Sequence, residues 1–85
     1  MKKVILYQID DNDYSMKPIC EFGLVDGQVK IVKGRNTEGI WQDVERGIVG
    51  EDEKLLYPKD GIKFLARLKY AYSGSYVRAG DIFDD

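Results

Sequence analysis

One dipeptide, Asp26-Gly27, does most to limit the folds open to this chain. It separates two runs rich in β-forming residues, Ile19 to Val25 and Gln28 to Lys33. Both turn residues tolerate a positive φ, which the two-residue type I′ turn of a β-hairpin requires. In the second run Val29 and Ile31 alternate with polar residues, so one side should be buried and the other solvated. The sequence therefore predicts an antiparallel hairpin at this place.

Further strands and two helices are predicted on either side of the hairpin. The apolar run Lys3 to Ile9 indicates a first strand, which ends at a cluster of Asp and Asn residues. Glu38 to Ile48 carries apolar residues at a spacing of four, as an amphipathic helix does. Pro58 to Tyr72 shows the clearest amphipathic pattern, and its proline suits a first helical turn. Gly74 should end that helix, and Ser75 to Ala79 is expected to form a short last strand.

These elements predict the α+β class, with a small three- to four-stranded antiparallel sheet and two helices packed on one face. Residues 1–80 should form a single domain, and residues 81–85 an acidic, frayed tail. Aromatic side chains are expected to supply core volume, namely Phe22, Trp41, Phe64 and Tyr72. A chain this short buries only about 60–65% of its unfolded surface, and one face of its sheet would be free. We therefore expect a homodimer.

The composition argues against catalysis. The chain has no histidine, which removes the usual acid or base near neutral pH and the imidazole ligand of zinc. Its one cysteine, Cys20, lies between apolar residues of a predicted strand and is expected to be a buried structural thiol. The acidic cluster at residues 10–13 lacks the spacing of a calcium-binding EF-hand loop and is predicted to be a solvated turn. We predict no enzyme activity, no cofactor and no metal.

The sequence also bears on location. The apolar run after Met1 is shorter than a secretion signal requires, and no run approaches the roughly 20 apolar residues that cross a bilayer. A single cysteine forms no intramolecular disulfide, which fits a reducing compartment. We expect a cytoplasmic protein that has no membrane partner.

Charge is distributed unevenly along the chain. Between Lys54 and Ala79 there are six basic residues, one acid and four tyrosines, in a protein whose net charge is −2. Lys59, Lys63 and Arg67 are spaced by four in the predicted helix, and Tyr70 lies on the same side. Such a face suits a phosphate backbone. Every amphipathic helix also needs a polar side toward solvent, however, and this simpler interpretation is favoured.

A second polar cluster follows at Ser73-Gly74-Ser75-Tyr76-Val77-Arg78. A glycine turn can point N–H groups at an anion, and two hydroxyls and the Arg78 guanidinium would complete such a site. The favoured alternative is a helix end followed by an edge strand, in which Arg78 pairs with an acid such as Asp81. Taken together, the candidate binding residues are Lys59, Lys63, Arg67, Tyr70, Ser73, Ser75, Tyr76 and Arg78.

The segments Tyr57 to Leu68 and Tyr72 to Ala79 resemble the C-terminal part of short uncharacterised prokaryotic proteins. The shared pattern is P-x-D-G-x-x-F-L…S-G-S-Y-x-R-A and covers about a quarter of the chain. This resemblance implies no activity and no site residues. The predicted function is a non-catalytic interaction module that contacts a protein partner or itself. The alternative is anion or nucleic-acid binding through the basic helix face and the segment from Ser73 to Arg78.

Overall fold

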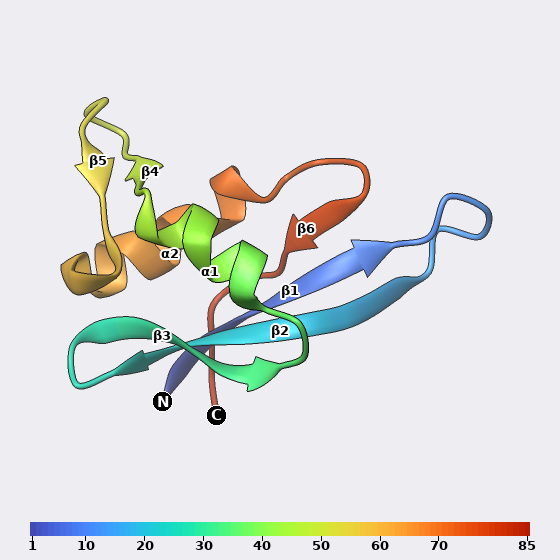
Figure 1. The fold of residues 1–85 in the computed structure, drawn as a ribbon, viewed down its shortest axis with the longest axis horizontal. Coiled ribbons are helices and arrows are strands. Elements are labelled where there is room, and N and C mark those ends of the chain that lie inside the picture. Colours follow the sequence, from blue (N-terminus) through green and yellow to red (C-terminus); the bar gives the residue numbers. More distant parts are fainter.

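The computed structural model describes all 85 residues and has an α+β fold, which confirms the predicted class (Figure 1). The main sheet has the strand order β3-β2-β1-β6, and β7 pairs with β1 beside β6. Its strands are β1 (Lys2–Ile9), β2 (Met16–Val25), β3 (Gln28–Gly34), β6 (Val77–Ala79) and β7 (Phe83–Asp84). A separate small hairpin pairs β4 (Ile48–Val49) with β5 (Leu55–Leu56). The helices are α1 (Glu38–Glu45), the short 3₁₀ helix η1 (Pro58–Asp60) and α2 (Ile62–Ala71).

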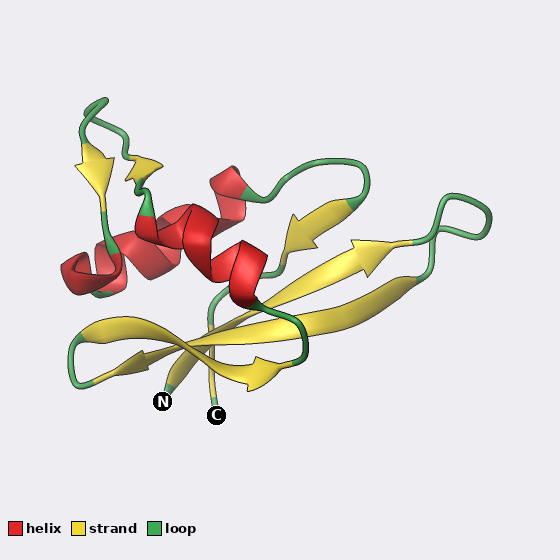
Figure 2. Cartoon of the chain, in the orientation of Figure 1, coloured by secondary structure: helices red, strands yellow, loops and turns green.

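Both α-helices lie on the same face of the main sheet, as predicted (Figure 2). Alternate side chains of each strand point toward the helices, and these side chains form an apolar core between the helices and the sheet. Its members are Val4, Leu6, Cys20, Phe22, Val29, Val44, Phe64, Leu65 and Leu68. Trp41 and Tyr72, also predicted to be core residues, are half-buried against this cluster. The Tyr72 ring stacks on Phe22, with a centroid distance of 6.4 Å.

The predicted hairpin is confirmed. Asp26 and Gly27 have φ values of 51° and 78°, as a type I′ turn requires, and Val25 pairs with Gln28 across the turn. β2 begins at Met16, three residues before the predicted start, because it extends its ladder with β1 beyond Pro18. The far end of the β1–β2 hairpin consequently projects from the body of the protein (Figure 1).

The two predicted helices are shorter than expected. The segment from Pro58 to Tyr72 is broken at Gly61, whose φ is 65° and ψ is −124°, so η1 and α2 are separate elements. A Cβ atom at Gly61 would lie 2.6 Å from the carbonyl oxygen of Gly27, so this position also forms the contact between α2 and the hairpin turn. The helix predicted to reach Ile48 ends at Glu45, and Gly47, with a φ of 95°, leads into β4.

The expectation of a frayed tail is wrong. Residues 83–84 form β7, in which Phe83 pairs with Lys3 and Asp84 with Lys2. The Lys2 ammonium also lies 3.0 Å from the Asp84 carboxylate. Opposite charges on adjacent strands and the apolar Phe83 side chain favour this pairing. No helix of the structure combines the length and the apolar character that a bilayer crossing needs.

Candidate interaction surfaces

The predicted basic helix face is only partly free. Arg67 on α2 donates a hydrogen bond from Nε to the carbonyl oxygen of Val49 at 2.8 Å, and its guanidinium lies 4.7 Å from the centre of the Tyr70 ring. Arg67 therefore ties the β4–β5 hairpin to α2. Lys59 belongs to η1, where its ammonium lies 5.9 Å from the Tyr57 ring centre. Lys63 is the one cation of this predicted set on α2 that has no interaction with a neighbouring group.

Acidic residues lie close to this helix face. A hollow of about 690 Å³ beside α2 is lined by Lys63 and Tyr70, but also by Glu51, Asp52 and Asp81. Asp81 accepts a hydrogen bond from the Lys69 ammonium at 2.6 Å, which raises the pKa of Lys69 above its ordinary value. Carboxylates in the same hollow repel a polyanion, so this surface is a poor match for a phosphate backbone.

The segment from Ser73 to Arg78 bonds to itself and to the end of α2. Ser73 and Arg78 form an isolated β-bridge, and Ser73 Oγ donates to the carbonyl oxygen of Tyr70 at 3.2 Å. Arg78 Nε donates to the carbonyl oxygen of Gly74 at 3.0 Å, so its expected pairing with Asp81 is wrong. Ser75 and Tyr76 are exposed. The predicted site residues of this segment thus mainly close a loop between α2 and β6.

The sequence predicted a free face of the sheet, but Arg78 is the only predicted binding residue that lies on it. Cross-strand partners point to the same face, and Lys3–Gly23, Ile5–Glu21 and Tyr7–Pro18 all pair on the side away from the core. The Met1 and Val32 side chains cover Gly23 on that side. We call this surface the uncovered face, and its side chains are Met1, Lys3, Ile5, Tyr7, Pro18, Glu21, Lys30, Val32, Lys33, Arg78, Phe83 and Asp85.

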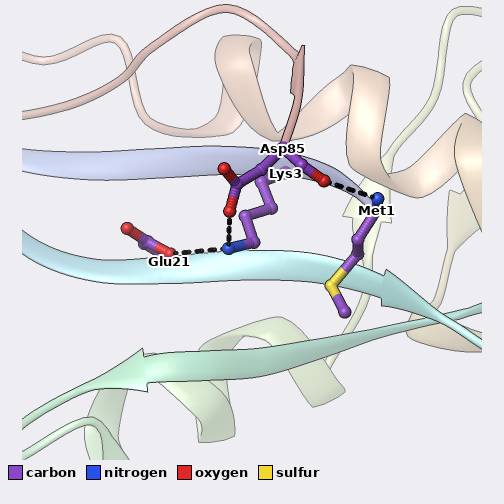
Figure 3. Close-up of polar contacts among 4 residues, drawn as sticks. All are labelled: Met1, Lys3, Glu21 and Asp85. Carbon is purple, nitrogen blue, oxygen red and sulfur yellow. Dashed lines mark hydrogen bonds and ion pairs between the residues drawn. The ribbon is translucent and has the colours of Figure 1, made fainter.

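A small ion-pair cluster lies on the uncovered face (Figure 3). The Lys3 ammonium is 2.6 Å from the Asp85 carboxylate and 3.5 Å from that of Glu21. The hydrogen bond between Lys3 and Asp85 raises the pKa of Lys3 and lowers the pKa of Asp85. The side chains of Lys3 and Glu21 are only 18% and 19% exposed, so this pair is already largely removed from water.

The cysteine thiol and the possible metal ligands are two further features of the chain. Cys20 is buried, and burial raises the pKa of its thiol to about 11, far from the range of a reactive nucleophile. No three Cys, Asp or Glu side chains come together to hold a metal ion. No buried side-chain nitrogen or oxygen is left without a hydrogen-bond partner.

No protein-family model, curated protein or solved structure matches the chain. The likeness of its C-terminal part to short prokaryotic proteins consequently stays a resemblance of sequence pattern.

Proposed function

We propose that this protein is a non-catalytic interaction module that associates with a second copy through the uncovered face. The supporting observation is that large apolar side chains stand on a sheet face without a covering layer. Phe83 is 37% exposed, Val32 39% and Met1 52%, and the half-buried Ile5 and Tyr7 lie further along β1 on the same face. Exposed apolar side chains gathered among charged ones on one face are typical of a protein contact.

The exposed surface of the whole molecule supports the same proposal. It amounts to 5845 Å², whereas a monomer of 9.7 kDa typically exposes about 5,100 Å². The excess of about 700 Å² approaches the roughly 800 Å² that each partner buries in an interface of standard size. Part of the excess belongs to the projecting hairpin end, since residues 11–18 are all exposed.

The ion-pair cluster gives this face a means of specificity. Lys3 and Glu21 are already paired and mostly shielded from water within the monomer. Covering them therefore adds a smaller desolvation cost than covering two separate, solvated charges. A partner that left either charge unpaired would bind less well, so the cluster selects the register in which two faces meet.

Anion or nucleic-acid binding is the weaker alternative. Its two arginines, Arg67 and Arg78, already donate to backbone carbonyl groups. The remaining free cation on α2, Lys63, shares its hollow with Glu51 and Asp52. These contacts favour the solvated interpretation of the basic helix face.

Sedimentation equilibrium over a wide concentration range tests the proposed self-association. The wild-type chain should show a reversible dimer in the micromolar range. In Ile5→Lys a lysine would stand opposite Glu21, where it can pair and leave the monomer folded, while it disrupts the apolar contact. Dimerisation should weaken by at least about tenfold, or 1.4 kcal/mol.

Ile62→Lys is the matched control, because Ile62 is 45% exposed on α2, away from the uncovered face. This variant should dimerise like the wild type, and circular dichroism should show both variants folded. A wild-type chain that stays monomeric at high micromolar concentration would refute the proposal. Equal weakening by the two variants would place the contact elsewhere.

A further inference from the structure

β3 is the open edge of the main sheet. Its neighbour on one side is β2, and its other side has no strand beside it. None of the backbone groups of Gln28–Gly34 has a hydrogen bond outside the ladder with β2. Such an edge is a template on which an extended chain can add a strand.

A groove runs between this edge and α1. It has a volume of about 600 Å³ and is lined by Lys30, Ile31, Val32, Lys33, Gly34, Thr37, Glu38 and Trp41. The Trp41 indole N–H donates to the Glu45 carboxylate at 2.6 Å, which fixes the ring along α1. A groove between an edge strand and a helix holds a peptide strand by its main chain, and the side pockets select its residues. A half-buried tryptophan is also a frequent anchor of binding energy.

We propose that this β3–α1 groove binds an extended peptide segment in which acidic and apolar side chains alternate. Lys30 and Lys33 pair with Gly23 and Glu21, so both lysines stand on the uncovered face. Side chains of an added strand on that face would lie beside two ammonium groups. Side chains on the opposite face would meet Trp41 on the helix side of the sheet. Successive residues of a strand point to opposite faces, so the partner requires acids at every second position.

A second copy of β3 is a poor occupant of the same edge. In a two-fold antiparallel pairing of β3 with itself, the uncovered faces of the two sheets continue into one another. Lys30 and Lys33 of both chains would then crowd one face, and like charges on neighbouring strands are destabilising. Edge lysines of this kind oppose self-pairing. They leave the edge open to a strand of opposite charge.

Fluorescence of Trp41 provides a direct test, because this is the only tryptophan of the chain. The Ile5→Lys variant is titrated, so that self-association does not contribute to the signal. The probe is the peptide acetyl-Glu-Val-Glu-Val-Glu-Val-amide, and the charge control is its lysine-valine counterpart. We expect saturable binding of the acidic peptide and at least about tenfold weaker binding of the basic one.

Two further arms separate strand addition from attraction between charges. N-methylation of alternate peptide amides removes main-chain donors without a change of charge, and it should abolish binding. Lys30→Gln/Lys33→Gln should weaken binding by about tenfold, whereas Lys63→Gln on α2 should not. The proposal is overturned if the N-methylated peptide or a single-stranded oligonucleotide binds as well as the acidic peptide. It is equally overturned if no saturable change appears at millimolar peptide.

Discussion

Gly61 is the position at which a single added carbon atom should destabilise the fold most. Its φ of 65° and ψ of −124° lie where non-glycine residues are rarely found. A Cβ atom there would lie 2.6 Å from the carbonyl oxygen of Gly27, a distance that Cβ atoms do not adopt. Because the obstacle is backbone, it cannot rotate away as a flexible side chain would. Gly61→Ala must therefore move α2 away from the β2–β3 turn.

The expected loss has two parts. Backbone strain of this kind costs about 1–3 kcal/mol, and forced separation of packed elements costs about 1–3 kcal/mol more. We expect Gly61→Ala to reduce the free energy of unfolding by about 2–6 kcal/mol, out of roughly 4–13 kcal/mol for a chain of this length. The melting temperature should fall by about 10 °C or more.

Two further glycines separate these contributions. Gly27 has a φ of 78° but no atom within 4 Å of an added Cβ, so Gly27→Ala carries strain alone, about 1–2 kcal/mol. Gly39 lies in α1 with open space around it, and Gly39→Ala should stabilise by about 0.5–1 kcal/mol. Urea unfolding, monitored by Trp41 fluorescence, measures the free energy of unfolding of all three variants. If Gly61→Ala lost no more stability than Gly27→Ala, the close contact between α2 and the hairpin turn would be refuted.

Two other predictions concern ionisable groups. The pKa of Asp85 is lowered in the folded protein, so its contribution to stability is complete above the ordinary value of 3.8 and is lost as the pH falls below it. In Asp85→Asn the free energy of unfolding, measured by urea titration, should therefore fall less between about pH 4 and pH 2 than it does in the wild type. An equal fall in both proteins would contradict the contact between Asp85 and Lys3. Cys20, with a thiol pKa of about 11 and a buried side chain, should resist alkylation in the native protein and react fully once urea unfolds it. Rapid native labelling would show that the core opens at β2.

The hairpin at Asp26-Gly27 was predictable because its cause is local. A positive φ at two adjacent residues and the alternation beside them belong to the same short stretch of chain. The buried side of α2 was predictable for the same reason, since Phe64, Leu65 and Leu68 share one helical face. Ile62 lies in the same predicted helix but is 45% exposed, because the break at Gly61 places it at the first turn of a separate helix.

The surfaces proposed for binding depend on which residues meet across long stretches of sequence. β1 alternates Val4 and Leu6 with Ile5 and Tyr7, so both of its sides are apolar, and only the placement of the helices decides which side stays uncovered. In the same way, the sequence shows that Arg67 is basic, but only the fold brings the carbonyl group of Val49 within hydrogen-bond distance of its guanidinium.

Turn chemistry and periodicity act over a few residues, so the hairpin, the α+β class and the apolar helix face follow from short stretches of sequence. The break at Gly61, the pairing of β7 with β1 and the β3–α1 groove arise only in the packed fold. Each of these depends on close approach between segments far apart in the chain. Such contacts form when the whole core packs, and no short window of sequence contains both partners.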